Sequence, residues 1–323
     1  MTEQSSALAI EARGLVKIFG TKRAVDGVDL SVPVGSIYAL LGPNGAGKTT
    51  IINMLTTLLK PDGGSAKVFR HDVLRETQVV RQLISLTGQS AAVDEKLSGH
   101  ENLTVFAMLL GLGRSEANRR ATELLDEFGL AGAANQTIEK YSGGMRRRLD
   151  LACSMIVQAP LIFLDEPTTG LDPRTRLQMW DIIRGLVSTG STIVLTTQYL
   201  DEADQLADRV AVIDQGKIVA EDTPRNLKAA IGKVTLRMQL ANENDVEEAA
   251  RITGEVLGTR ASVPDPRQVT APLTNSEKVT DLLIALRGAS IRLLSVSMQE
   301  PTLDEAFLAL TEGTRQAEVT VRQ

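Results

Sequence analysis

Short apolar runs separated by glycine make up the first part of the chain. Three such runs, at residues 8–10, 15–16 and 28–30, stand between single glycines, which favour turns. Residues 7–41 therefore predict a small antiparallel group of strands. The last run, at 37–41, is apolar throughout and predicts a buried strand.

A helical period replaces this pattern over residues 99–157. Apolar side chains recur there at the i, i+3, i+4, i+7 spacing of one helix face, as in Leu103, Phe106, Ala107 and Leu110 and again in Ala121, Leu124, Leu125 and Phe128. Strands and helices then alternate, with strand-like runs at 161–165, 192–196 and 210–213 and helical segments near 174–188 and 199–207. This order predicts a mostly parallel sheet with helices on both faces, interrupted by an all-helical insertion.

The pattern resets beyond about residue 232. The predicted elements from there follow the order β-α-β-β-α-β, which indicates a small split βαβ sandwich, and a last helix begins with a capping box at Thr302 and Glu305. We therefore expect an α/β domain at 7–231 with a helical subdomain at about 95–157, a small α+β domain at 232–311, and a disordered tail at 312–323.

Composition narrows the class of protein. With 323 residues, 43% of them apolar, the chain is long enough for two domains with full cores. It lacks an apolar stretch of about eighteen residues and a basic, apolar signal segment at its start, so we expect a cytosolic chain that does not span a bilayer. The net charge of −5, without a long basic block, argues against nucleic acid as a partner. One cysteine and two histidines exclude an internal disulfide and a histidine-rich metal site.

The nine residues after the run at 37–41 carry the strongest chemical signal. They have the spacing G-x-x-x-x-G-K-T between a strand and a helix, the pattern of a loop that holds phosphates with its backbone N–H groups. The glycines allow the bend, and the following helix adds the positive end of its dipole. We expect Lys48 to reach the β- and γ-phosphates of a nucleoside triphosphate and the Thr49 hydroxyl to ligate Mg²⁺. The predicted loop comprises Gly42, Pro43, Asn44, Gly45, Ala46, Gly47, Lys48, Thr49 and Thr50.

Two carboxylates end the apolar run at 161–165. Asp165 and Glu166 come at the carboxyl end of a predicted strand, the edge at which ligands bind in parallel α/β sheets. We expect Asp165 to organise the Mg²⁺ shell and Glu166 to polarise the attacking water. Removal of such a base costs about 10²–10⁴ in rate.

Ser142, Gly143 and Gly144 predict a second anion site. A serine followed by two glycines at the start of a helix aims a hydroxyl and backbone amides at one point. Because the loop at 42–50 already forms a complete phosphate cradle, a second cradle suggests the nucleotide of another molecule. Two chains arranged head-to-tail would each complete the other's site.

Taken together, these motifs resemble those of an ABC-transporter ATPase cassette. The resemblance covers roughly residues 7–230 and is carried by 42–50, Gln89, 141–145, 164–167 and 170–173. It implies a P-loop NTPase fold with an antiparallel β subdomain and a helical subdomain, ATP and Mg²⁺ as ligands, and a homodimer that forms on ATP binding. It also implies roles for single residues: Phe19 stacks on adenine, Gln89 senses Mg²⁺ and water, Ser142 and Gly144 grip the opposite protomer's γ-phosphate, Glu166 is the catalytic base, and Asp172 lies at the dimer interface. From the residues alone, Phe19 is either an adenine platform or a core residue.

Gln198 departs from the pattern that the resemblance implies, because the cassette places a histidine after the strand at 192–197. Glutamine offers only a neutral hydrogen bond where histidine can carry charge, so hydrolysis is slower or the role of the side chain is positional. A solvent-facing Gln198 stays an alternative. Arg146, Arg147 and Arg148 fit a solvated helix face. Together with Gln198 and the segment 301–308, they resemble the daunorubicin-resistance (DrrA-type) branch of exporters.

The resemblance favours one function over two others. The leading hypothesis is the ATP-hydrolysing subunit of an exporter of amphiphilic drugs, antibiotics or lipids, peripheral at the cytoplasmic face of the cell membrane and bound to a separate permease. The resemblance places the permease contact near residues 90–104. The alternatives are a soluble ABC ATPase in DNA repair or translation, and a nucleotide-gated regulator with little hydrolysis, which only Gln198 suggests. The sequence does not name the cargo.

Overall fold

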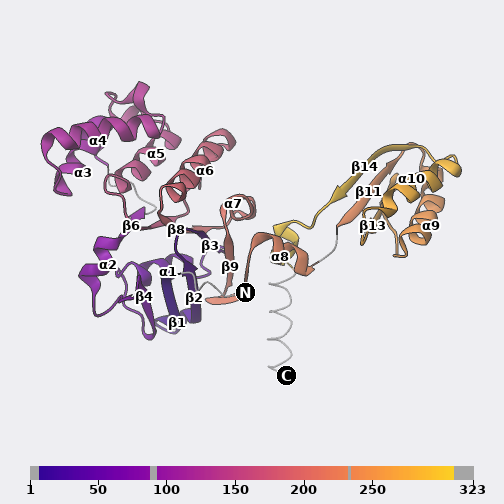
Figure 1. The fold of residues 1–323 in the computed structure, drawn as a ribbon, viewed down its shortest axis with the longest axis horizontal. Coiled ribbons are helices and arrows are strands. Elements are labelled where there is room, and N and C mark those ends of the chain that lie inside the picture. The colour runs from indigo at the N-terminus through magenta and orange to yellow at the C-terminus, as the bar shows by residue number, and fades with distance from the viewer. Residues whose placement is uncertain (1–6, 88–92, 232–233, 309–323) are drawn as a thin grey trace. The chain divides into compact units, whose positions relative to one another are not determined.

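A computed structural model describes residues 7–87, 93–231 and 234–308 of the chain (Figure 1). The chain divides into two compact units, with the boundary in the sequence between Pro224 and Arg225. The predicted domain boundary, at 231, and this one differ by a single short helix, α8 (Pro224–Ile231). Within the described residues, no helix has the length and apolarity needed to cross a membrane.

An antiparallel sheet opens the first unit. Its strand order is β2-β1-β4-β5, formed by β1 (Leu8–Phe19), β2 (Lys22–Pro33), β4 (Gly63–Val68) and β5 (His71–Asp72). Strands β1 and β2 pair as a hairpin along their whole length, and β4 pairs with the other edge of β1. The antiparallel group predicted for residues 7–41 is confirmed for β1 and β2, and β4 joins it from beyond the phosphate loop. The strand at 37–41 belongs instead to the second, mostly parallel sheet.

The second sheet of this unit has the order β10-β9-β3-β8-β7-β6. Every pair in it is parallel except β9 with β10, so the predicted mostly parallel sheet is confirmed. Strands β3, β7 and β8 are buried along their whole length, which explains their continuous apolar runs. The bounds are β3 (Ile37–Leu41), β6 (Ile84–Thr87), β7 (Leu161–Asp165), β8 (Thr192–Thr197), β9 (Arg209–Asp214) and β10 (Lys217–Asp222).

Helix α1 (Lys48–Leu55) joins the two sheets into one core. Its side chains Ile51, Ile52 and Leu55 belong to the same buried cluster as Ile10 of β1 and Leu40 of β3. The helix starts immediately after the phosphate loop, and its buried face fixes the loop against both sheets. The loop is therefore held by a core that both sheets share.

The helical insertion is gathered at one end of this unit, as Figure 1 shows for α3, α4 and α5. Ser98 and Glu101 cap α3 reciprocally, Ser142 caps α5, and Asp172 caps α6, so each of these helices begins at a side-chain cap. The helices of the unit are α2 (Thr77–Leu83), α3 (Gly99–Leu109), α4 (Arg114–Glu127), α5 (Gly143–Ser154), α6 (Pro173–Ser188) and α7 (Leu200–Leu206), with short 3₁₀ turns at Ala131–Ala133 and Ile138–Lys140.

The second unit contains one antiparallel sheet of order β12-β13-β11-β14. Apolar side chains of α9 and α10 pack with those of β11 and β13 into one core, the arrangement of a split βαβ sandwich. Its elements are β11 (Thr235–Leu240), a 3₁₀ turn (Glu243–Asp245), α9 (Val246–Leu257), β12 (Ser262–Asp265), β13 (Gln268–Pro272), α10 (Lys278–Gly288) and β14 (Leu293–Gln299).

Residues 303–308 are helical, and Thr302 and Glu305 form the predicted reciprocal cap. The predicted tail at 312–323 lies outside the described residues.

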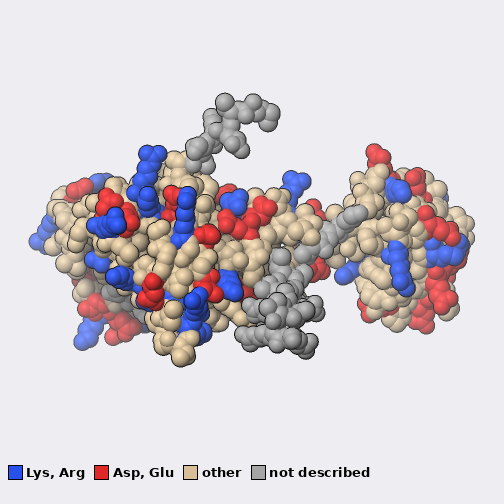
Figure 2. Space-filling view, turned by 90° about the horizontal axis from the view of Figure 1, so that it is seen from below, with Lys and Arg blue, Asp and Glu red and all other residues tan. Residues whose placement is uncertain are grey.

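Charged side chains of both signs are interspersed on the face drawn in Figure 2. A continuous basic strip is absent from the described residues on this face. The expectation that nucleic acid is not a partner stays a prediction.

Candidate functional site

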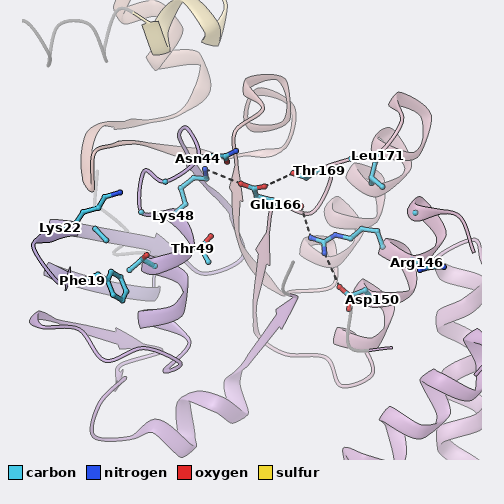
Figure 3. Close-up of a pocket in the computed structure, with 17 residues that line it drawn as sticks. Phe19, Lys22, Asn44, Lys48, Thr49, Arg146, Asp150, Glu166, Thr169 and Leu171 are labelled. Atoms are coloured by element: carbon cyan, nitrogen blue, oxygen red, sulfur yellow. Dashed lines mark hydrogen bonds and ion pairs between the residues drawn. The ribbon is translucent and has the colours of Figure 1, made fainter. Parts of the chain in front are cut away.

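A cavity of about 890 Å³ lies in the first unit, at the carboxyl ends of the parallel strands (Figure 3). Its volume falls within the range of small-molecule sites. The predicted phosphate loop forms one wall, and the start of α5 and the segment after β7 contribute to the opposite side. The lining residues are Phe19, Lys22, Ala24, Asn44, Gly45, Gly47, Lys48, Thr49, Thr50, Gly143, Arg146, Arg147, Asp150, Glu166, Thr169, Gly170 and Leu171.

Close backbone contacts explain two glycines of the loop. A Cβ on Gly42 would lie 2.3 Å from the carbonyl oxygen of Ile213, and a Cβ on Gly47 would lie 2.4 Å from that of Ala24. Gly47 also has a φ of +109°, which residues with a side chain rarely adopt. The loop therefore keeps its shape only if both positions lack a side chain.

We predict that Gly47→Ala destabilises the chain by about 2–5 kcal/mol, the sum of backbone strain and overpacking. Gly45→Ala is the matched control, because Gly45 also has a positive φ, +78°, but has no atom within 4 Å of the added Cβ. It should cost only about 1–2 kcal/mol. Thermal unfolding of the two variants measures the difference, and equal melting temperatures would contradict the role assigned to the Ala24 contact.

Lys48 is buried at the base of the loop. Its ammonium donates to the carbonyls of Gly42, at 2.7 Å, and Pro43, at 3.0 Å, and lies 3.8 Å from Oε1 of Glu166. Burial lowers the pKa of Lys48, while the charges of Glu166 and Asp165 act in the opposite direction. Figure 3 shows the Lys48 and Glu166 side chains pointing toward each other. A cation and a carboxylate from the two predicted motifs therefore meet in one site.

Thr49 and Asp165 form a second pair of oxygen donors. The Thr49 hydroxyl donates to both carboxylate oxygens of Asp165, at 3.2 and 3.0 Å, and the Thr196 hydroxyl of β8 donates to the same carboxylate. Hydroxyl and carboxylate oxygens are the ligands that Mg²⁺ prefers in proteins. The residues present therefore fit a magnesium ion shared with phosphate oxygens.

Glu166 adopts a left-handed backbone, with a φ of +50°. Its N–H donates to the Thr196 hydroxyl at 3.0 Å, and its Oε2 accepts from the Thr169 hydroxyl at 3.2 Å. This conformation costs a residue with a Cβ about 1–2 kcal/mol, so surrounding contacts must hold it. Its carboxylate lies between Lys48 and Thr169, in position to act on a water beside a bound phosphate.

The solvated face predicted for residues 146–148 is wrong for two of the three arginines. Arg147 donates to the carbonyls of Asp165, Glu166 and Pro167, and Arg148 donates to those of Phe128 and Gly129. Arg146 keeps 37% of its side chain exposed, pairs with Glu95 at 2.7 Å and donates to the carbonyl of Glu139 at 3.2 Å. The error arose because charge predicts exposure, whereas a guanidinium with enough acceptors can be buried.

The second anion cradle begins helix α5. The Ser142 hydroxyl accepts from the backbone N–H of Met145 at 3.2 Å, and Gly143 lines the cavity. A Cβ on Gly144 would lie 2.8 Å from Cγ2 of Thr175. Ser142 is exposed, so the cradle is open to a ligand from outside the chain.

Asp172 anchors the start of helix α6. Its carboxylate accepts from the N–H groups of Arg174 and Thr175 and from the Thr175 hydroxyl, and these bonds hold the pKa of Asp172 below its ordinary value. The immediate partners of this carboxylate are thus within its own helix turn. A role toward another molecule is not required to explain them.

Three further predicted residues have different outcomes. Phe19 lines the cavity, is half exposed, and has the Lys17 ammonium 5.6 Å from its ring centroid, so it is not a core residue. Gln198 is partly exposed and does not line the cavity. Gln89 lies outside the described residues.

Glu202 of α7 is a buried carboxylate that the sequence did not single out. Its Oε1 accepts from the Thr168 hydroxyl at 2.7 Å and from the Trp180 indole N–H at 3.3 Å. Burial raises the pKa of Glu202 above its ordinary value, against the hydrogen bonds, which act in the opposite direction. The side chain therefore ties α7 to α6 and to the segment that follows Glu166.

We predict that Glu202→Gln flattens the pH dependence of stability. Because the pKa is raised in the folded state, the unfolded chain loses this proton first as the pH rises, and stability falls through the window above the ordinary pKa. The wild-type melting temperature should therefore drop more than that of the variant as the pH rises above the ordinary pKa of a glutamate. Glu139→Gln, which removes an exposed carboxylate, is the control. Parallel curves for wild type and Glu202→Gln would contradict the prediction.

Several known proteins are similar to this chain in sequence or in structure. The model of the ABC transporter family matches residues 25–169. The daunorubicin/doxorubicin resistance ATP-binding protein DrrA of Streptomyces peucetius is 52% identical over 304 residues, which are 94% of this chain and 92% of that protein. The doxorubicin resistance ATP-binding protein DrrA of Mycobacterium tuberculosis is 42% identical over 310 residues, 94% of each chain. A solved structure of the ATP binding subunit of an ABC transporter has a TM-score of 0.61 and 26% identity, and the match covers 69% of this chain and 92% of that one.

Proposed function

This chain belongs to the ATP-binding proteins of the ABC transporter family, and on that premise we propose that it hydrolyses ATP to drive export of an amphiphilic compound through a separate membrane permease. It is the ATPase subunit of such a transporter. The relatives whose names report resistance to daunorubicin and doxorubicin support a drug or antibiotic as cargo. They do not favour a function in DNA repair or translation.

The position of Glu166 carries the proposed reaction. Its carboxylate lies 3.8 Å from the Lys48 ammonium at the floor of the phosphate loop, where the γ-phosphate of ATP would bind. Lys48 would neutralise charge on the β- and γ-phosphates, and Glu166 would accept a proton from the attacking water. Phe19, exposed at the rim of the same cavity, would stack on the adenine.

Thr49 and Asp165 would hold a magnesium ion, with Gln89 as a further ligand by resemblance. When bound, the ion would neutralise charge on the phosphates. Asp165 is already oriented for this by the hydroxyls of Thr49 and Thr196. The phosphate loop would bind the nucleotide through the backbone N–H groups between Gly42 and Thr50.

A second copy of the chain would complete the site. The exposed cradle at Ser142, Gly143 and Gly144 supplies a hydroxyl and backbone N–H groups for the γ-phosphate held by the partner's loop. Asp172, which begins the helix beside Gly144, would lie at this interface. ATP binding would therefore close a homodimer, and hydrolysis would release it.

The membrane contact is made through the permease in this proposal. The chain would sit as a peripheral subunit at the cytoplasmic face of the cell membrane. Co-expression of a tagged chain with a candidate permease tests the assignment, with co-purification from membranes and resistance to an anthracycline as readouts. We expect wild type to give both, and Glu166→Gln to co-purify without resistance. A chain that never associates with membranes in the presence of its permease would contradict the proposal.

Gln198 provides a further prediction about turnover. We expect Gln198→Ala to lower ATPase activity by about tenfold and Gln198→His to retain it, because a hydrogen-bond donor near the γ-phosphate would be lost in the first and kept in the second. Steady-state hydrolysis by the three proteins is the measurement. Equal turnover in all three proteins would exclude a role for this side chain. Its position outside the cavity lining would then explain why it has no effect.

A further inference from the structure

Arg147 makes an unusual set of contacts for a residue on a helix surface. Its Nη2 donates to the carbonyls of Asp165, at 2.9 Å, and Glu166, at 3.0 Å, and its Nε donates to that of Pro167, at 3.1 Å. Three successive peptides after strand β7 are thus bound by one guanidinium. Its side chain is only 14% exposed.

Four carboxylates compensate the buried charge of Arg147. Burial lowers the pKa of this guanidinium, while the charges of Asp150, Asp165, Glu166 and Glu202 act against that shift. Asp150 forms an ion pair with Arg147, because its Oδ2 lies 3.5 Å from Nη1. A neutral side chain at position 147 would leave these carboxylates without their shared cation, so the position has an electrostatic reason to be basic.

The contacts of Arg147 hold the one strained residue of the catalytic segment. Glu166 has a φ of +50°, and its N–H is fixed by the Thr196 hydroxyl. Arg147 binds the carbonyl on the other side of the same residue and the carbonyl of Asp165 before it. The left-handed turn that aims Glu166 at Lys48 is therefore held from β8 on one side and from α5 on the other.

Helix α5 also begins with the second anion cradle, Ser142–Gly144. Arg147 lies within the second turn of this helix, so any shift of the cradle along or about the helix axis displaces the guanidinium with it. The same side chain thus connects the cradle to the backbone of Glu166.

We propose that Arg147 is a positioning residue for ATP hydrolysis. When helix α5 shifts, its guanidinium shifts the backbone of Glu166 with it. Binding of a phosphate at the Ser142–Gly144 cradle is thereby coupled to the position of the catalytic carboxylate. This inference rests on the proposed function, in which Glu166 is the base and the cradle binds the γ-phosphate of a second copy. Arg147 acts through Glu166 and not on the nucleotide.

The test is a double-mutant cycle on the full chain with Mg²⁺-ATP. Arg147→Gln should lower kcat by about 10- to 100-fold, the effect of a misplaced catalytic group, and change KM by less than about threefold. Arg147→Lys, which keeps the charge and some donors, should give an intermediate kcat. In the Glu166→Gln background, Arg147→Gln should add less than about a twofold loss, because the two side chains act as one unit.

Arg148→Gln is the matched control. Arg148 is the next residue of α5 and also binds two backbone carbonyls, but those of Phe128 and Gly129 in the helical insertion. We expect this variant to lower the melting temperature and keep kcat within about threefold of wild type. A purely structural role for Arg147 would make the two variants alike.

The outcomes separate this inference from the proposed function. If Glu166→Gln hydrolyses ATP slowly, two results would overturn this inference and leave the proposed function standing. One is wild-type turnover by Arg147→Gln. The other is a loss of kcat from Arg147→Gln that is as large in the Glu166→Gln background as in the wild-type chain. Wild-type turnover by Glu166→Gln would overturn the proposed function and the inference with it. If the Arg147→Gln chain does not fold, Arg147→Lys decides. Full activity of Arg147→Lys would overturn the inference. A lower kcat with unchanged KM would support it, provided that Arg147→Lys causes no further loss of kcat in the Glu166→Gln background.

Discussion

Glu166→Gln is expected to lower kcat for ATP hydrolysis by about 10²–10⁴-fold while ATP still binds. The amide is nearly isosteric with the carboxylate and can keep the hydrogen bond from Thr169, so the left-handed backbone should be preserved. It cannot accept a proton from water. The loss should therefore fall on kcat and leave the nucleotide affinity within about threefold.

This variant also tests the predicted dimer. A chain that binds ATP without hydrolysing it should accumulate as a homodimer, measured by size-exclusion chromatography with and without ATP. Glu139→Gln serves as the control, since it removes an exposed carboxylate outside the cavity lining. If Glu166→Gln hydrolysed ATP at the wild-type rate, another group would be the base. If it remained a monomer with ATP and with its permease, the shared site would be wrong.

Lys48→Ala is expected to lower kcat/KM by at least about 10²-fold and to weaken ATP binding as well. The ammonium is buried and already held by the carbonyls of Gly42 and Pro43, so it is oriented toward the loop before nucleotide arrives. A charge fixed at low exposure interacts strongly with phosphate oxygens. Its removal also leaves Glu166 without the cation 3.8 Å away.

Lys22→Ala is the matched control for this experiment. Lys22 lines the same cavity but is exposed, so solvent screens its charge and kcat/KM should stay within about threefold of wild type. Nucleotide titration and steady-state hydrolysis on the three proteins are the measurements. Equal losses in both variants would show that the cavity binds ATP by its overall charge and not through the loop lysine.

The amino-acid sequence by itself determined the elements that depend on neighbouring residues. The run at 161–165 predicted strand β7, the spacing at 42–50 predicted the loop and the start of α1, and Ser142 with the two glycines after it predicted the start of α5. Backbone geometry, capping and one-sided burial act over a few residues, so they leave a readable local pattern.

Local patterns were less informative for a short strand at the edge of a sheet. Strand β10 was not predicted, because its apolar run is only three residues long, from Ile218 to Ala220, and β10 is the edge of the sheet. An edge strand needs little apolar surface, and it forms because β9 offers backbone partners. Backbone pairing with β9 therefore supports this strand together with the packing of Ile218 on the core.

Only the tertiary structure decided that two further charged side chains, Arg147 and Glu202, are held inside the protein beside the site. Arg147 is separated from Asp165 and Glu166 by 18 and 19 residues, and Glu202 from Thr168 by 34. Their charges predict solvent exposure, and nothing in the neighbouring residues contradicts it. Burial becomes favourable only when the fold brings carbonyls, hydroxyls and opposite charges around each of them, because a buried charge needs several partners at once. Those partners come from the end of β7, the segment after it, α5 and α6, and their meeting is a property of the packed chain.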